Sequence, residues 1–600
     1  MTDVEKESNR LDPVDGLVDN RRAAAMLGVS VGTFRVWATR SLTAKSGIST
    51  AMPVPVATMH GHVYRVEDIE EFGRQIALSS RALRTQQRSL GAYFTPNDAA
   101  ELMVRWAVRH SEDVLLEPSL GDGQFAIAAQ RFANSRGWGK LDIHACELDP
   151  ETAGRAVASG AVASDRVRVG DFLSASDLPV VDAVIGNPPY VRVRELDSSL
   201  RKSALNSAQR TMGQPMDPAG SVWMPFVAKG TEQLRRGGRL ALVLPLDFTY
   251  VKYARSLWSF LGQSYGRIRI LRFRKRVFPE IMQNVLILLA ENKGSSTSEV
   301  ELIARERLAD LPDGQIGAGV KVSIDEVARG DRAFQFALLP TRARETLTIL
   351  EPLTGAAHSR VKFNIGYVSG NKKFFHPDSS VITEFGLPPE SLRPTVESSR
   401  QLSRVGLGTG SEVPTAFLWT PGDQVAEQER AYVEHGSREG VDMAYKCRIR
   451  NPWFRVPGVK VPDVFLTTFS DRPRLHLNDA GWVASNSVLS GFTRPDESPR
   501  AFVESWYTPL TLLSTELHIH SLGGGVMIAV PREADSVRLL KHDVTLRPEL
   551  DRLDDALKSG HSDSAYNVGA ESISNLVGSE GLAAIQEGAD VLTRWRKSRG

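Results

Sequence analysis

The feature that most constrains the fold of this sequence is an alternation of short apolar runs with helical stretches between residues 114 and 295. The runs of strand length occur at 114–116, 143–146, 183–185, 240–244 and 285–289. Alternation of this kind is typical of an α/β fold, in which helices cover both faces of a mostly parallel sheet. We therefore expect a sheet of this type in the first half of the chain.

Length and composition bound the other possibilities. A chain of 600 residues with 42% hydrophobic and 24% charged residues is expected to form two to four globular domains. The formal charge is only +2, so any basic surface must be local. Two cysteines exclude a disulfide framework and a cysteine-rich zinc site, and we expect no metal. The sequence shows neither an apolar leader segment nor an apolar run of about 18 residues. We therefore expect a cytoplasmic location.

Three domains are predicted, over residues 1–80, 81–295 and 296–600. In the first, two short helices separated at Gly28–Ser30 indicate a helix-turn-helix over 20–40, and a strand is expected at His62–Arg65. This region resembles the small winged module of MerR- and excisionase-like proteins, although a hairpin that serves only packing would look the same. A linker is expected at Gly294–Ser298, and a mixed α+β domain follows it.

A candidate ligand-binding turn follows the first strand. The segment 117–125 joins a strand to a helix and contains Gly121 and Gly123, which permit close approach of the backbone to a ligand. Glu117 and Asp122 flank these glycines. Carboxylates here disfavour a pyrophosphate and favour a ligand that carries an ammonium or a sulfonium.

Acidic residues also end the next two strands. Glu147 ends the second strand, where an acid commonly accepts both ribose hydroxyls. Asp171 follows the third strand and is positioned to accept from the exocyclic amine of an adenine, while Phe172 is positioned to pack on its ring. The three strand ends together predict one adenosine-containing ligand.

The fourth strand leads into Asn187-Pro188-Pro189-Tyr190. An aromatic amine is a poor nucleophile because its lone pair is delocalised into the ring. Two acceptors on its hydrogens, the Asn187 side-chain oxygen and the Pro188 carbonyl, favour attack and stabilise the charge that develops. The two prolines fix the direction of that carbonyl, and Tyr190 offers a flat face to an extruded base.

With these residues in order, the chain resembles the gamma class of adenine-N6 DNA methyltransferases of type II restriction–modification systems over about residues 91–290. The resemblance implies a Rossmann-like domain that binds S-adenosyl-L-methionine, followed by a target recognition domain. It implies methionine contacts at Tyr93, Thr95 and Pro96, in a segment similar to the N-terminal motif of the family. It also places Phe278 on the flipped base opposite Tyr190. The implied activity is site-specific adenine methylation that protects host DNA from a cognate endonuclease.

Two basic segments are candidates for contact with double-stranded DNA. The first, Arg267–Arg276, is expected to form a strand with one basic face that meets phosphates, or else a solvated edge strand. The second, Lys446–Arg455, interleaves basic and aromatic residues. Runs at 366–372 and 523–525 resemble elements of the recognition domains of these enzymes.

Other functions remain open on the sequence. The Asn-Pro-Pro-Tyr loop also serves enzymes that methylate protein glutamines or RNA bases. A combined restriction–methylation polypeptide, and a regulator that binds an operator through the N-terminal module, are further alternatives.

Overall fold

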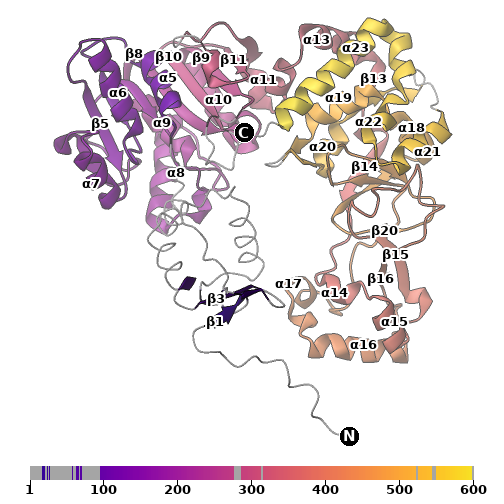
Figure 1. Cartoon of the computed structure of the whole chain (residues 1–600). Helices are drawn as coiled ribbons and strands as arrows, with labels where there is room; N and C mark the ends of the chain where they lie inside the picture. The colour runs from indigo at the N-terminus through magenta and orange to yellow at the C-terminus, as the bar shows by residue number, and fades with distance from the viewer. Residues whose placement is uncertain are drawn as a thin grey trace. The chain divides into compact units, whose positions relative to one another are not determined.

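The chain forms two compact units, 1–93 with 189–196, and 94–188 with 197–600. The computed structural model (Figure 1) describes residues 17–20, 23, 26, 57–58, 62–65, 68–69, 95–275, 277, 285–311, 315–521, 525–542 and 549–597. Of the predicted helix-turn-helix only Asn20, Ala23 and Met26 are among them, so that prediction lies outside the described residues.

The first unit contains a small antiparallel sheet in the order β1-β3-β2. Its strands are β1 (Leu17–Asp19), β2 (Ala57–Thr58) and β3 (His62–Arg65). The strand expected at His62–Arg65 is therefore confirmed. Val18 pairs with Tyr64, and both side chains are buried, so this pair contributes to a core beneath the sheet.

The second unit is built around a nine-stranded sheet in the order β12-β11-β9-β10-β8-β7-β4-β5-β6. The strands are β4 (Val114–Glu117), β5 (Asp142–Glu147), β6 (Val167–Val169), β7 (Val181–Gly186), β8 (Leu234–Pro245), β9 (Tyr265–Phe273), β10 (Val285–Lys293), β11 (Glu299–Arg305) and β12 (Val320–Ser323). Strands β6, β5, β4, β7 and β8 are parallel neighbours, and β10 is antiparallel to β8 and β9. The mostly parallel sheet is thus confirmed.

Amphipathic helices connect these strands. They are α5 (Asn97–Ala107), α6 (Gln124–Ser135), α7 (Pro150–Ala158), α8 (Ser198–Met212), α9 (Trp223–Gln233) and α10 (Arg255–Ser264). Local sequence explains the start of α7. This helix begins with Pro150, and the Asp149 side chain accepts from the Thr152 N–H at 3.0 Å. In α9, Gly230 packs so close to β7 that a Cβ there would lie 3.2 Å from Val184 Cγ1.

The sheet continues past residue 295. β11 pairs in parallel with β9, and β12 pairs with β11. The expected linker is therefore a turn between two strands of one sheet, bound by hydrogen bonds from Gly294 N to Ser264 O and from Thr297 N to Gly262 O. The extent of each predicted domain stays a prediction.

Beyond this sheet, short strands and helices alternate. The strands form a four-stranded sheet, β14 (Val361–Ile365), β21 (Val488–Thr493), β17 (Val464–Thr467) and β19 (Leu475–Leu477), and smaller sheets of β13 (Thr354–Ala356), β24 (Arg538–Leu540), β15 (Leu392–Val396), β16 (Phe417–Trp419), β20 (Val483–Ala484), β18 (Phe469–Ser470), β22 (His520–Ser521) and β23 (Met527–Ile528). The helices are α11 (Ile324–Arg329), α12 (Ala333–Ala337), α13 (Thr341–Leu350), α14 (Lys372–Phe375), α15 (Ser379–Phe385), α16 (Glu427–Arg438), α17 (Tyr445–Arg448), α18 (Pro499–Trp506), α19 (Pro509–His518), α20 (Pro531–Ser536), α21 (Leu550–Lys558), α22 (Ser562–Asn567) and α23 (Ala570–Arg596), which is kinked at Gly578.

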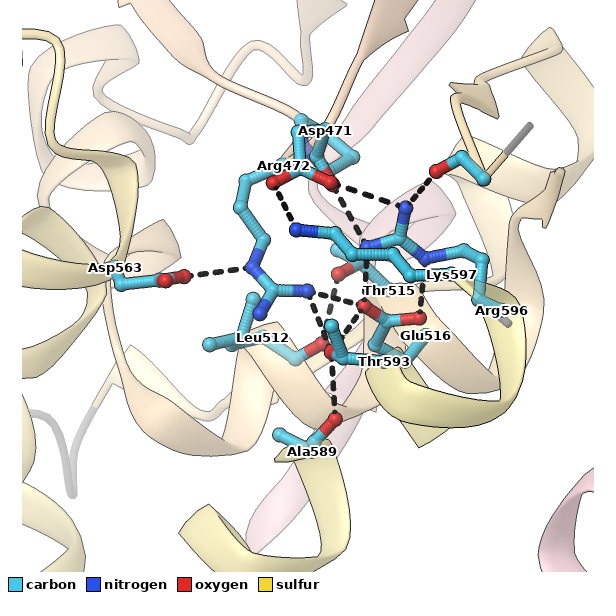
Figure 2. Close-up of polar contacts among 12 residues, drawn as sticks. Asp471, Arg472, Leu512, Thr515, Glu516, Asp563, Ala589, Thr593, Arg596 and Lys597 are labelled. Atoms are coloured by element: carbon cyan, nitrogen blue, oxygen red, sulfur yellow. Dashed lines mark hydrogen bonds and ion pairs between the residues drawn. The ribbon is translucent and has the colours of Figure 1, made fainter. Parts of the chain in front are cut away.

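A buried polar cluster joins the end of α23 to α19 (Figure 2). The Glu516 carboxylate is 1% exposed and accepts from Arg472, from Thr593 Oγ1 at 2.8 Å and from Arg596 Nε at 2.9 Å. Asp563 also accepts from Arg472 at 2.6 Å. The side chains of Arg472 and Arg596 are both at least nine-tenths buried, and Glu516 is the carboxylate that they share. Each also pairs with a second, more exposed acid, Arg472 with Asp563 and Arg596 with Asp471 at 3.2 Å.

We predict that Glu516→Gln lowers the free energy of unfolding by about 3–5 kcal/mol, because two buried cations lose their shared carboxylate. Urea titration followed by tryptophan fluorescence measures this. Glu101→Gln, which breaks an exposed pair with Arg105, is the control and should have almost no effect. Equal small losses in the two variants would show that the cluster is not needed for stability.

Candidate active site at the carboxyl edge of the sheet

The expected strand-end residues gather at one edge of the sheet. Glu117 ends β4, Glu147 ends β5, Asp171 follows β6 and Asn187 follows β7. These four strands are parallel neighbours, so their carboxyl ends meet at the same edge. Ligands of open α/β sheets bind there.

The glycine turn after β4 is tied to the end of β5. The Gly121 N–H donates to Glu147 Oε2 at 2.9 Å. Gly121 and Gly123 have φ of 54° and 76°, a conformation that favours glycine. A Cβ at Gly123 would lie 2.6 Å from Ala161 Cβ, whereas one at Gly121 would meet nothing within 4 Å. Gly123 therefore serves close packing, and the space beside Gly121 is open.

Glu147 is half-buried and held on both sides. Its Oε1 accepts the Asp149 N–H at 3.0 Å, and its backbone carbonyl accepts the Gly170 N–H at 2.8 Å. Each carboxylate oxygen has two lone pairs, so both retain capacity for a further donor. The geometry is suited to a carboxylate that accepts a pair of hydroxyls.

Glu117 occupies a different environment. It is 3% exposed, and its carboxylate accepts the Ala126 N–H at 3.1 Å, which ties β4 to the first turn of α6. Burial raises the pKa of Glu117 well above its usual value, and the nearby negative charges of Asp122 and Glu147 add to this. Its side chain therefore supports the glycine turn from behind.

We predict that Glu117→Gln changes how stability depends on pH. A carboxyl whose pKa is raised in the folded state stabilises that state at low pH and loses this contribution as pH rises above the unfolded value of 4.5. An uncharged amide has no such loss. Melting temperatures from about pH 5 to about pH 8 should thus shift in favour of the variant as pH rises. Parallel profiles would contradict the raised pKa.

Asp171 begins a tight turn after β6. Its Oδ1 accepts the Leu173 N–H at 2.9 Å, and its Oδ2 accepts from the hydroxyl of Ser203 in α8. The adjacent Phe172 ring is 2% exposed and packs against Phe226, with ring centroids 5.1 Å apart. Phe172 lies in the apolar layer behind Asp171, and its contact with an adenine stays a prediction.

Two hydroxyls hold Asn187. Ser119 Oγ donates to the Asn187 carbonyl at 3.1 Å, and Asn187 Nδ2 donates to Thr95 Oγ1 at 3.4 Å. Thr95 is 4% exposed and, with Pro96, directly precedes α5. This orientation assigns the amide nitrogen of Asn187 to Thr95.

The remaining predicted residues are placed as follows. Pro188 is buried beside Asn187. Pro189 and Tyr190 are partly buried and belong to the first unit, in the segment 189–196. Tyr93 and Phe278 lie outside the described residues.

Three residues that hold the site residues or their turns were not identified from the sequence. Ser119 holds Asn187, Ser203 holds Asp171, and the Lys229 ammonium donates to the Leu173 carbonyl in the turn after β6. Ser119 stands inside the glycine turn segment, so its position was a usable signal. Ser203 and Lys229 lie on helices far along the chain and carry no local signal.

The structure corrects the prediction for the basic segment 267–276. Strand β9 lies between β10 and β11, so it is not an edge strand. Neighbouring acids neutralise three of its cations; Glu301 pairs with Arg267, Glu291 with Arg269 and Glu306 with Arg274. Arg272 lies over the ring of Trp595 at 4.9 Å. These ion pairs link β9 to β10 and to the end of β11, and contact of this segment with phosphates stays a prediction.

The second basic segment divides into a structural and an exposed part. Arg450 donates to the carbonyls of Val368 at 2.6 Å and Ser369 at 2.8 Å, and Trp453 and Phe454 pack against an apolar core. Tyr445 and Ile449 are 64% and 62% exposed, and Lys446 and Arg448 are also exposed. Within residues 445–449, every side chain except that of the buried Cys447 is therefore accessible to a partner.

Within the described ranges, no helix combines the length and apolar character that a membrane span requires. Among the same residues, no three or more His, Cys, Asp or Glu side chains are arranged to hold a metal ion.

Two parts of the chain match family models of restriction–modification methyltransferases. Residues 178–278 match the Eco57I restriction-modification methylase family, and residues 332–574 match the family described as Type II methyltransferase M.Eco57I, C-terminal domain. The first match includes Asn187. The second spans most of the chain beyond the nine-stranded sheet.

Individual relatives agree with this. The chain is similar to type II methyltransferase M.AccI of Acinetobacter calcoaceticus, 20% identical over 68% of this chain and 75% of that protein. M.XamI of Xanthomonas campestris pv. amaranthicola is 24% identical over 65% and 73%. M.HincII of Haemophilus influenzae is 28% identical over 36% of this chain and 39% of its own length. These matches confirm the resemblance to type II restriction–modification methyltransferases.

Proposed function

We propose that the protein transfers a methyl group from S-adenosyl-L-methionine to the exocyclic N6 of an adenine flipped out of duplex DNA at a specific sequence. The observation that carries this proposal is the position of Asn187, held by Ser119 and Thr95 at the same sheet edge as Glu147 and Asp171. An amide acceptor beside an adenosine-type site is the arrangement that methylation of an aromatic amine needs.

The residues present fit the cofactor. Glu147 retains acceptor capacity for the ribose hydroxyls and Asp171 for the adenine amine. The open space beside Gly121 allows close approach of the methionine part. The resemblance to the gamma class adds Tyr93, Thr95 and Pro96 as candidate contacts. When bound, the cofactor supplies an electrophilic methyl group on a sulfonium.

The chain supplies the rest of the chemistry. Asn187 Oδ1 and the Pro188 carbonyl accept the two amine hydrogens of the target adenine, which increases the nucleophilicity of its nitrogen. Pro188 and Pro189 restrict the backbone that carries these acceptors. By resemblance to the gamma class, Tyr190 and Phe278 are the candidate aromatic residues for stacking on the flipped base. No strong general base is required, because the proton leaves after the nitrogen becomes cationic.

The match to a family described as a restriction-modification methylase supports duplex DNA as the partner and protection from a cognate endonuclease as the role. Methylation of RNA or of a protein glutamine needs the same acceptor pair, so a substrate panel must separate them. Purified protein with labelled cofactor should label duplex DNA, and neither ribosomal RNA nor a release factor. Magnesium-dependent cleavage of DNA by the chain would instead support a combined restriction–methylation enzyme.

We predict that Asn187→Ala lowers kcat by about 10²–10³-fold, the effect of removing one acceptor from a preorganised site. The Kd for S-adenosylhomocysteine should stay close to that of the wild type, because Asn187 is assigned to the target base. Single-turnover methylation and isothermal titration measure the two quantities.

Glu147→Ala is the matched comparison for this experiment. It should raise the KM for the cofactor and leave the rate at saturation largely unchanged. If Asn187→Ala weakens cofactor binding and spares the chemical step, the assigned roles are incorrect.

We further propose that the exposed segment 445–449 contacts the DNA backbone. Replacing Lys446 and Arg448 together with glutamine should reduce the slope of log binding constant against log salt by about 2, because each phosphate contact releases about one counterion. The control is Lys321→Gln, since Lys321 already pairs with Glu299 at 2.7 Å. An unchanged slope in the double variant would exclude this contact.

A further inference from the structure

Lys229 is a buried lysine for which the proposed chemistry has no use. It lies in α9 and is 1% exposed. Burial lowers the pKa of its ammonium. A buried charge is costly unless its environment compensates it, so the contacts of Lys229 require an explanation.

The contacts of Lys229 are directed at one turn. Its Nζ donates to the Leu173 carbonyl at 3.2 Å and to the Ala175 carbonyl, and it lies 5.2 Å from the centre of the Phe172 ring. The negative charges of Glu232 and Asp171 oppose this lowering of the pKa, but burial has the larger effect. The side chain therefore crosses from α9 to satisfy the backbone of the segment after β6.

That turn begins at Asp171. The Ser174 N–H donates to the Asp171 carbonyl at 3.2 Å, and the Ala175 N–H donates to the Phe172 carbonyl at 3.2 Å. Within it, the Leu173 N–H holds the Asp171 carboxylate. All these bonds lie within residues 171–175. Lys229 holds the Leu173 and Ala175 carbonyls from outside the turn, and this also fixes the direction of the Asp171 carboxylate.

We propose that Lys229 is a positioning residue for the adenine end of the cofactor site, where its ammonium holds the 171–175 turn and so aims the Asp171 carboxylate at the exocyclic amine of the cofactor. This rests on the proposed function, which assigns that amine to Asp171. Ser203 holds the same carboxylate from α8, so the acid is fixed through its backbone by Lys229 and through its side chain by Ser203.

The test compares two ligands that differ at the group Asp171 recognises. S-adenosylhomocysteine carries the exocyclic amine, and S-inosylhomocysteine carries a carbonyl oxygen in its place. Wild-type full-length protein should bind the adenosine compound more tightly. In Lys229→Met, which keeps the length of the side chain and removes its charge, the Kd for S-adenosylhomocysteine should rise about tenfold, the effect of losing one well-aligned hydrogen bond. The Kd for S-inosylhomocysteine should change little.

Lys229→Arg restores a cation and should recover part of the preference for the adenosine compound. Ser203→Ala should reduce the preference in the same direction, and it decides the matter if Lys229→Met does not fold. Melting temperatures identify variants with general damage, which would weaken both ligands by the same factor.

A Kd ratio that stays at the wild-type value in Lys229→Met, or in Ser203→Ala where the first variant does not fold, would overturn the positioning role. Failure of the wild-type protein to bind S-adenosylhomocysteine would overturn the proposed function instead. The two failures are therefore distinguishable.

Discussion

The hydrogen bond from the Gly121 N–H to the Glu147 carboxylate joins the turn after β4 to the end of β5. It depends on the parallel pairing of these strands, which places both carboxyl ends at one edge of the sheet. The same pairing continues to β6 and β7, so Asp171 and Asn187 arrive beside them. A site spread over about 70 residues of sequence is thus assembled by strand order alone.

A second layer of contacts fixes the side chains that this order brings together. Ser119 and Thr95 hold Asn187, and Ser203 holds Asp171. Glu117 is buried behind the turn and bound to the first turn of α6. Preorganisation of this kind matters because acceptors aimed before the reaction need no reorganisation during it.

The strands and the strand-end residues were predictable because their signals are local. Apolar runs of strand length marked β4, β5, β7, β8 and β10, and an acid or an Asn-Pro-Pro followed directly on four strand ends. The ion pairing of the arginines in and just after β9 was not predictable, because the acids that pair with them belong to β10, to β11 and to the segment after β11. Burial of Phe172 and the role of Lys229 likewise depend on α9, which the sequence does not connect to the turn after β6.

The two basic segments show that the number of cations in a segment does not predict how many are available to a partner. The segment at 267–276 has more cations than the one at 446–455, yet three of its six cations are paired with acids of the same unit. Within the second segment, Arg450 binds backbone carbonyls while Lys446 and Arg448 are exposed. Pairing and exposure, which depend on tertiary structure, therefore separate structural cations from those available to DNA.

The central claim concerns the atom that receives the methyl group. The most direct measurement is to incubate the protein with duplex DNA and isotopically labelled S-adenosylmethionine, digest the DNA to nucleosides and identify the labelled product by mass spectrometry. The account predicts labelled N6-methyldeoxyadenosine, formed about 10²–10³-fold more slowly with Asn187→Ala. Label on a cytosine carbon or ring nitrogen, or label found only in RNA or protein, would contradict it.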